Sequence, residues 1–356
     1  MAPLVNALVQ RWPLLASLAR VELASLPTPV APMARASDKT DCEIWVKRDD
    51  LTAPEYGGNK VRKLEYLLGE ARSRGVDTLV TAGAVGSHHV FATAYYGREH
   101  GFETYAVVTP QPYRRHVEEQ LRADLAVGAH LYPARSLRQV ARRMVELSAR
   151  LRFWGRHPWI VPLGGSNVYG TLAFVNAGLE LAAQIDAGLC PDFDAVYVAT
   201  GTSATVAGLA LGLAAGGVRT DVVAVRIYDR LFSSRARIGQ LIARAEARLR
   251  AIEPRFPEVA ARALASVQVD ARELGRGYGY TTPASEAAAE LAASDGLTLD
   301  ETYTSKALAA LLRDVERERR GKKLLFWHTL SSASLEPFLR EVPEAPERFV
   351  KLMLLS

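Results

Sequence analysis

The sequence predicts an α/β protein built on mostly parallel, twisted sheets. Short β-rich runs alternate with longer helical stretches along most of the chain, which is the pattern of strand–helix–strand units. Three expected strands end in glycine-bearing loops that open helices, at residues 82–88, 163–168 and 200–204. With 356 residues, the chain is long enough for two domains.

The expected elements follow one another without an internal repeat. Residues 1–25 are expected to be helical until Pro27 breaks the pattern. Strands are expected at 43–47, where polar and apolar residues alternate, and then at 77–81, 104–109, 159–162, 195–199, 222–226 and 323–327. Helices are expected from Lys60 onward and at 88–99, 114–126, 136–151, 168–187, 206–213, 235–250, 257–267, 285–294 and 305–317.

Composition excludes several classes of protein. The chain is 49% apolar and 23% charged, as in ordinary globular proteins. Its net charge of +5 comes from 44 basic residues spread among 39 acidic ones, so no nucleic-acid partner is expected. No run of about 18 apolar residues indicates a membrane span. Cys42 and Cys190 form no CxxC pair, which fits a reducing, cytoplasmic environment.

A glycine-rich turn delivers Lys60 to the start of an amphipathic helix, on which Leu64, Leu67 and Leu68 share one face. A helix N-terminus lowers the pKa of a lysine, and flanking glycines let a ligand approach its nitrogen. A lysine in this setting suits Schiff-base chemistry. A lone Gly-Gly-Asn-Lys is more typical of a solvated surface lysine, so the motif needs support from the rest of the chain.

The three glycine loops supply that support. Backbone N–H groups at the start of a helix bind anions, and ligands collect at the carboxyl ends of parallel strands. The loop at 200–204 also carries hydroxyls, which suits a phosphate. It is neither a Walker A motif nor GxGxxG, so ATP and dinucleotides are disfavoured. For any single loop, a tight strand–helix connection is the alternative.

Other candidate residues have structural alternatives. His88 and His89 are adjacent, point apart on a helix and lack a third ligand nearby, so no metal site is expected. Asp49 and Asp50 follow a strand and are expected to brace the Lys60 turn electrostatically. Tyr278 alone could be a core aromatic residue with a bonded hydroxyl, and so could Tyr303.

Together these motifs resemble the pyridoxal-phosphate (PLP) enzymes of the tryptophan-synthase-β fold (fold type II), in particular the 1-aminocyclopropane-1-carboxylate (ACC) deaminase / D-cysteine desulfhydrase family. The resemblance runs from about Leu26 to Ala333. It rests on Leu-Pro-Thr-Pro at 26–29, Lys-Arg-Asp-Asp-Leu at 47–51, GGNKVRKLEYLL at 57–68 and Tyr-Thr-Ser-Lys-Ala at 303–307.

The resemblance implies two three-layer α/β domains and a homodimer. A large PLP-binding domain would comprise residues 1–62 and 175–356, and a small domain would comprise residues 63–174. Lys60 would bind PLP covalently, and the catalytic residues would be Lys60, Ser87, Tyr278 and Tyr303. The other implied cofactor-binding residues are Asn59, His88, Thr200, Gly201, Thr202, Ser203, Ala204, Thr304 and Thr329. The implied substrate-binding residues are Ser87, His88, His89, Gly164 and Tyr278.

The resemblance implies a PLP-dependent lyase or deaminase acting on a small amino acid. At the position of Thr304 the deaminases carry an acid against the pyridine nitrogen, and the desulfhydrases carry a threonine. A neutral hydroxyl does not hold the pyridine proton as a carboxylate does, so Thr304 favours α,β-elimination over ring opening. Lys60 would remove the Cα proton, and the products would be a keto acid and ammonia.

Two alternatives stay open. One is a PLP-dependent β-replacement enzyme or racemase on the same fold. The other is a catalytically degenerate member that only binds a ligand. The chain departs from the family at Gly86–His89, where the family reads Gln-Ser-Asn-His, and at Leu330–Ser331, where the family reads Gly-Gly. Substrate choice is expected to depend on the first of these segments.

Overall fold

The structure is a computed structural model that describes residues 6–317, 319–340 and 344–354. The chain forms two compact units. The first unit comprises the N-terminal segment up to Leu18, Leu23–Lys63 and Asn167–Ser332. The second unit comprises Ala19–Glu22, Leu64–Ser166 and the C-terminal segment from Ala333. The chain passes from the first unit into the second within one helix, α3 (Asn59–Ser73).

The expected domains exchange at 62/63 and at 174/175, whereas the compact units exchange at 63/64 and at 166/167. The second unit also takes up residues 19–22 and 333–356, which the sequence assigned to the large domain. The division into domains therefore stays a prediction, and each unit is described by itself below.

The first unit is built on a six-stranded sheet with the order β1-β2-β10-β7-β8-β9. Only β1 pairs antiparallel, with β2, and the other pairs are parallel. The strands are β1 (Val30–Pro32), β2 (Glu43–Lys47), β7 (Ala195–Thr200), β8 (Asp221–Arg226), β9 (Val267–Asp270) and β10 (Lys323–Trp327).

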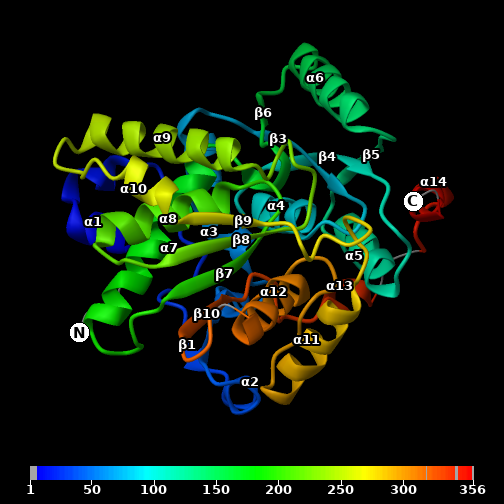
Figure 1. Cartoon of the computed structure of the whole chain (residues 1–356). Helices are drawn as coiled ribbons and strands as arrows, with labels where there is room; N and C mark the ends of the chain where they lie inside the picture. Colours follow the sequence, from blue (N-terminus) through cyan, green and yellow to red (C-terminus); the bar gives the residue numbers. More distant parts are fainter. Residues whose placement is uncertain (1–5, 318, 341–343, 355–356) are drawn as a thin grey trace. The chain divides into compact units, whose positions relative to one another are not determined.

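Helices cover both faces of this sheet, as Figure 1 shows for α7 to α9 on one side and α11 and α12 on the other. The first group is α7 (Val168–Asp186), α8 (Ala204–Gly216), α9 (Arg235–Ile252) and α10 (Ala260–Ala265). The second group is α2 (Ala34–Asp38), α11 (Pro283–Ser294) and α12 (Thr304–Arg317). Buried residues of the second group pack on Ile44, Tyr197 and Val225 of the sheet and form one hydrophobic core. The N-terminal segment adds α1 (Ala7–Arg11) and the 3₁₀ turn η1 (Pro13–Ser17), and η2 (Asp49–Leu51) follows β2.

Helices α7 and α8 pack at backbone distance because glycines line their contact. A Cβ on Gly208 would lie 2.2 Å from the carbonyl oxygen of Thr171, and one on Gly212 would lie 2.3 Å from that of Val175. Every residue of α8 from Ala204 to Ala215 is buried. This contact fixes the helix that follows the 200–204 loop.

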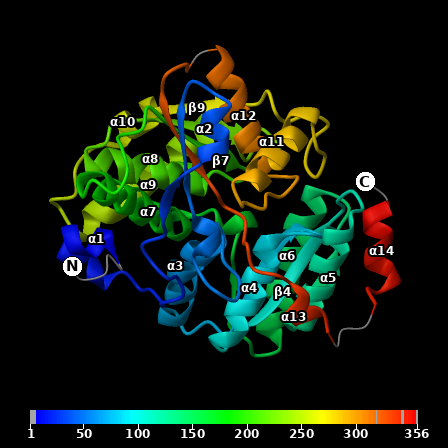
Figure 2. The same cartoon turned by 90° about the horizontal axis from the view of Figure 1, so that it is seen from below.

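The second unit is built on a four-stranded parallel sheet with the order β5-β4-β3-β6. Its strands are β3 (Thr78–Ala84), β4 (Glu103–Thr109), β5 (His130–Pro133) and β6 (Pro158–Ile160). Its other elements are α4 (His88–Glu99), α5 (Arg115–Ala126), α6 (Leu137–Phe153), η3 (Leu163–Gly165), α13 (Glu336–Leu339) and α14 (Glu347–Leu354). The C-terminal segment packs on this unit through α13 on α5 and α14 on β5 (Figure 2).

The prediction of an α/β architecture with mostly parallel sheets is confirmed. The expectation of a helix over residues 1–25 is wrong where the structure describes them. Helix α1 ends at Arg11 because Pro13 restricts the backbone of Trp12, and no α-helix follows before Ala34. Residues 82–84 belong to strand β3 rather than to a loop. Within the described ranges, no helix is long and apolar enough to span a membrane.

Candidate active site

Lys60 lies in the first turn of α3, in the first unit. Its Nζ donates a hydrogen bond to Asn59 Oδ1 at 2.7 Å and lies 6.0 Å from the centre of the Tyr303 ring. Desolvation lowers the pKa of Lys60 from 10.5 to about 8, and the Asp300 carboxylate acts in the opposite direction. The lysine therefore holds a substantial fraction of neutral, nucleophilic amine near neutral pH.

The turn before Lys60 accepts only glycine at two positions. A Cβ on Gly57 would lie 2.2 Å from the carbonyl oxygen of Asp50. Gly58 has a φ of 90°, and a Cβ there would lie 2.8 Å from the carbonyl oxygen of Thr329. The same Thr329 oxygen accepts the N–H of Asn59 at 3.1 Å, so the end of β10 holds the start of α3.

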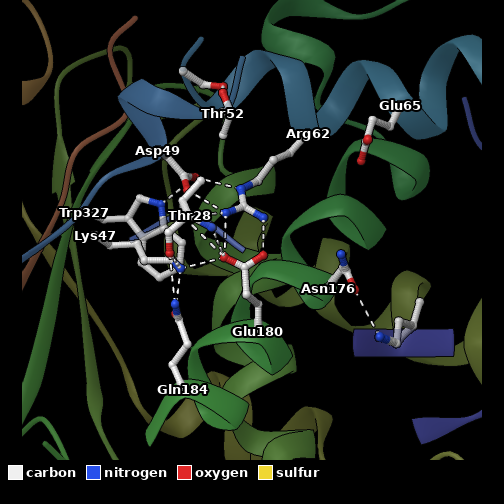
Figure 3. A network of polar contacts seen from close by, with 12 residues as sticks. Thr28, Lys47, Asp49, Thr52, Arg62, Glu65, Asn176, Glu180, Gln184 and Trp327 are labelled. Atoms are coloured by element: carbon white, nitrogen blue, oxygen red, sulfur yellow. Dashed lines mark hydrogen bonds and ion pairs between the residues drawn. The ribbon is translucent and has the colours of Figure 1, made fainter. Parts of the chain in front are cut away.

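A buried charge cluster lies behind this turn (Figure 3). Its members are Thr28, Lys47, Asp49, Arg62, Glu180, Gln184 and Trp327. Arg62 pairs with Asp49 at 2.7 Å and with Glu180 at 2.9 Å, and Lys47 pairs with Glu180 at 2.6 Å. Burial acts to raise the pKa of Glu180, but Arg62 and Lys47 outweigh it and lower that pKa to about 2.

The cluster braces the Lys60 turn, as predicted for Asp49. The carboxylate of Asp49 binds Arg62 two residues after Lys60, and its carbonyl oxygen accepts the Gly58 N–H at 2.9 Å. The carboxylate of Asp50 instead pairs with Arg48, and the backbone oxygen of Asp50 accepts the hydroxyl of Ser332.

The 200–204 loop joins β7 to α8 and leaves the N-terminus of that helix without a side-chain cap. Among the described residues, Ser203 is the one non-glycine with positive φ, at 76°. Its Oγ donates to the carbonyl oxygen of Phe232 at 2.6 Å and so does not cap the helix. The first-turn N–H groups of α8 and its positive dipole end are suited to an anion. Gly201 and Thr202 complete this loop before Ala204 opens the helix.

Two observations connect this loop with a polar ligand and with Lys60. Thr200 Oγ1 is buried and has no hydrogen-bond partner among the described residues. A buried hydroxyl without a partner is costly, and a phosphate oxygen would satisfy it. Asn59 Nδ2 lies 3.4 Å from Thr205 Oγ1 in the first turn of α8, so Asn59 joins the lysine to the loop.

Tyr278 and Tyr303 form a hydroxyl pair in the first unit. Their oxygens lie 2.9 Å apart and their rings meet edge to face at 5.7 Å. Burial raises the pKa of both phenols, so both stay neutral and each can donate or accept. Lys306 Nζ donates to the carbonyl oxygens of Leu274 and Gly277 at 2.9 and 3.2 Å, which holds the loop that presents Tyr278.

Asp300 organises the start of α12. Its carboxylate accepts the backbone N–H groups of residues 302, 303 and 304 at 3.0, 2.8 and 2.9 Å. It also accepts the hydroxyl of Thr304 at 2.6 Å, and that hydroxyl oxygen accepts the Asp300 N–H at 2.8 Å. Ser305 Oγ, next in sequence, is buried and has no partner among the described residues.

The other predicted site residues lie in the second unit. Ser87 precedes α4 and does not cap it with its side chain, which leaves its hydroxyl available to a ligand. Gly83 makes room for it, because a Cβ there would lie 2.5 Å from Ser87 Oγ. His88 opens α4, and Gly164 lies in η3 with a φ of 60°.

His89 is turned into the second unit. It is 3% exposed, its Nε2 lies 2.9 Å from Thr81 Oγ1 and its Nδ1 lies 3.4 Å from Thr93 Oγ1. With both ring nitrogens engaged by threonine hydroxyls, His89 links α4 to β3. We therefore do not retain His89 among the proposed substrate-binding residues.

The structure brings Asn59, Lys60, the 200–204 loop, the two tyrosines and Thr304 into one unit, and Ser87, His88 and Gly164 into the other. Sequence reasoning missed Asp300 and Thr205. An Asp before a helical pattern is a known N-cap sign, so Asp300 could have been found. Nothing in the sequence indicates that Thr205 bonds Asn59.

The residues of the first unit fit PLP. A lysine with a lowered pKa suits its aldehyde, and the uncapped start of α8 with the unpartnered Thr200 hydroxyl suits its phosphate. Groups of His, Cys, Asp and Glu that could hold a metal ion are absent from the described part of the chain.

Comparison with known proteins decides the family. The family model described as pyridoxal-phosphate dependent enzyme matches residues 21–329. The chain belongs to this family. Its sequence is 33% identical over 324 residues to the D-cysteine desulfhydrase of Yersinia pestis, covering 89% of this chain and 94% of that protein. It is 34% identical over 329 residues to the D-cysteine desulfhydrase of Serratia proteamaculans, covering 90% and 96%.

Solved structures also resemble this chain. The crystal structure of an ACC deaminase homologue matches with a TM-score of 0.75 and 29% identity over 98% of this chain and 99% of that one. The structure of O-ureido-L-serine synthase, at 18% identity and a TM-score of 0.60, shares the fold. Both matches confirm the predicted fold type.

Proposed function

We propose that this PLP-dependent enzyme catalyses α,β-elimination on a small amino acid and releases a keto acid and ammonia, as a D-cysteine desulfhydrase does. The observation that carries the proposal is Lys60, an amine with a pKa lowered to about 8 beside the uncapped start of α8. The 33–34% identity to proteins named D-cysteine desulfhydrase supports the choice of a β-thiol amino acid.

In this proposal Lys60 binds the cofactor's aldehyde carbon and later takes the proton from the substrate Cα. When bound, PLP supplies an electron sink that makes this proton acidic. Asn59 orients the Lys60 amine through its 2.7 Å hydrogen bond. Residues 200–204 bind the phosphate with the N–H groups of α8 and the hydroxyl of Thr200.

The remaining proposed roles concern the substrate. Tyr278 and Tyr303, neutral and bonded to each other, can pass a proton to the leaving sulfur. In this proposal Ser87, His88 and Gly164 are the amino-acid-binding residues, and Thr329 holds the Lys60 turn beside the cofactor. We also propose that the enzyme is a cytoplasmic homodimer, which the two unpaired cysteines and the family resemblance support.

ACC deamination is the second candidate, because the ACC deaminase homologue matches 98% of this chain. A panel of D-cysteine, L-cysteine, serine derivatives and ACC, assayed for sulfide, keto acid and ammonia, separates the two. The proposal expects a yellow protein that releases sulfide from D-cysteine. A PLP-loaded protein that releases ammonia only from ACC supports the second candidate. A protein that takes up no PLP contradicts both.

A further inference from the structure

The start of α12 carries a hydrogen bond whose direction is fixed by its partners. Thr304 Oγ1 lies 2.6 Å from Asp300 Oδ1 and 2.8 Å from the Asp300 nitrogen. The Asp300 N–H is a donor, so it points at a lone pair of the threonine oxygen. A carboxylate only accepts, so the one hydroxyl proton of Thr304 points at Asp300.

The hydroxyl of Thr304 can therefore only accept from a third group. Its proton is held by Asp300, one lone pair is held by the Asp300 N–H, and a single lone pair remains. The same carboxylate also receives three backbone N–H groups, which fix it against rotation. Turning the hydroxyl toward another acceptor would break a charge-assisted hydrogen bond in a buried place.

We propose that Asp300, acting through Thr304, keeps the ring nitrogen of bound PLP protonated. This inference rests on the proposed function and on the family resemblance, by which Thr304 faces that nitrogen. An unprotonated ring nitrogen would set its lone pair against that of Thr304 Oγ1, whereas a protonated one donates to it. The proton comes from solvent and stays on the ring nitrogen, while Thr304 keeps its own. Asp300 is a positioning residue here, since it touches Thr304 and not the cofactor.

The proposal reverses what the sequence suggests for Thr304. A threonine read alone is a neutral group that leaves the ring nitrogen unprotonated. Paired with Asp300, it presents an acceptor backed by a negative charge, which is the electrostatic role of a direct carboxylate. The electron sink is then strong enough for substrates with a poor leaving group.

The test is the ¹⁵N resonance of PLP labelled at its ring nitrogen and bound to the full-length protein. The wild-type protein is expected to show the position of a protonated pyridine. Thr304→Val, which keeps the shape but removes the acceptor, and Asp300→Asn are expected to shift it to the position of an unprotonated pyridine. Thr304→Ser keeps the hydroxyl and is expected to restore the protonated position.

Ser305→Ala is the matched control, because Ser305 Oγ is the neighbouring buried hydroxyl and has no partner in the part of the chain that the structure describes. It is expected to leave the resonance unchanged. An unprotonated position in the wild type, or a shift in Ser305→Ala but not in Thr304→Val, overturns the proposal while PLP binding stands. Failure of the protein to bind the label overturns the proposed function as well. If Asp300→Asn does not fold, the wild type, Thr304→Val and Thr304→Ser still decide the question.

Discussion

Two lysines of the first unit, Lys47 and Lys60, show how one side chain serves opposite purposes. Lys47 is fully buried and donates to Glu180, to Gln184 and to the Thr28 carbonyl oxygen, at 2.6 to 2.7 Å. The side chain of Lys60 has one hydrogen bond within the described ranges, to the neutral amide of Asn59. Burial lowers the pKa of Lys47 too, but this lysine has a complete set of acceptors, among them the Glu180 carboxylate, which favours its charged form. Lys60 lacks a carboxylate partner, and desolvation lowers its pKa to about 8.

The same contrast extends to the surroundings of each lysine. Around Lys47, opposite charges and hydrogen bonds compensate each other in the buried charge cluster. In the loop that Asn59 joins to Lys60, the hydroxyl of Thr200 is buried without a partner in the described part of the chain. Complete compensation indicates a structural role, and missing partners indicate the place of a ligand. The following predictions test this difference.

The largest effect is expected for Lys60→Ala. Loss of the amine removes both the covalent attachment of PLP and the base, so kcat/KM should fall by about a thousandfold or more, since general-base catalysis alone contributes about 10²–10⁴-fold. The cofactor-free variant should be no less stable than the wild type, because a desolvated amine is removed. Activity assays and thermal unfolding check both. Lys322→Ala, a half-exposed lysine, is the control that should change neither; an active Lys60→Ala contradicts the assignment.

Glu180→Gln should affect stability instead. It leaves Lys47 and Arg62 with a buried excess of positive charge, and breaking a buried pair costs about 3–5 kcal/mol of unfolding free energy. Chemical denaturation measures this. Glu119→Gln, in an exposed pair with Arg115, should cost less than about 1 kcal/mol. If Glu180→Gln and Glu119→Gln lost equal amounts of unfolding free energy, the buried charge cluster would contribute no more to stability than an exposed ion pair.

The dependence of the unfolding free energy on pH in the acid range gives a second measurement on Glu180. The pKa of Glu180 lies at about 2 in the folded protein against 4.5 as its ordinary value. The stabilisation is therefore complete above pH 4.5 and is lost as the pH falls toward 2. The Glu180→Gln variant should lack this part of the acid dependence.

The uptake of PLP by cofactor-free protein should depend on pH through Lys60. Only the neutral amine attacks the aldehyde, so the rate should rise with pH up to about 8 and then level. Between pH 8 and pH 6 it should fall by about fiftyfold, because about half of the amine is neutral at pH 8 and about 1% at pH 6. Stopped-flow absorbance measures the rate. In Asp300→Asn the midpoint should move to lower pH, because that carboxylate raises the pKa of Lys60. A midpoint near 10 would show an ordinary, solvated lysine.

The smallest effect is expected for Thr200→Val. Removing a buried hydroxyl that lacks a partner should stabilise the cofactor-free protein by about 1 kcal/mol. The same change should weaken PLP binding by about tenfold, or 1.4 kcal/mol. Calorimetry measures the stability of the cofactor-free protein, and PLP titration measures the affinity for the cofactor. Thr93→Val is the control, since its hydroxyl donates to the His89 carbonyl oxygen at 2.7 Å and its loss should only destabilise. Loss of stability in Thr200→Val would mean that the hydroxyl has a partner.

What the sequence predicts well is local. Lys60, the 200–204 loop and strands such as β2 and β10 follow from short patterns, and the structure contains them. Strand β9 (Val267–Asp270) was missed because four residues directly after a helix carry too little pattern, and β1 (Val30–Pro32) because it is a three-residue edge strand. The helix over residues 1–25 failed because Pro13 outweighs the apolar spacing.

The candidate site was predicted less completely, because its hydrogen bonds depend on how side chains meet in the folded structure, which short sequence patterns do not show. His89 was expected to bind the substrate, but its ring lies at hydrogen-bond distance from Thr81, on a strand eight residues earlier. Thr304 looked like a neutral hydroxyl, and only the structure shows that it donates its hydrogen bond to Asp300. The direction of a hydrogen bond depends on which donor meets which acceptor, and the spacing of residues in the sequence does not give this information.

Ser203 limits where this chain can be lengthened. Its left-handed backbone and its bond to the Phe232 carbonyl oxygen couple the anion-binding loop to a segment 29 residues later. An insertion between β8 and α9 would therefore pull directly on that loop. Gly188 offers the opposite case, since open space surrounds it and its neighbour Leu189 is 62% exposed. A fluorescent label or an affinity tag therefore belongs at residues 188–189.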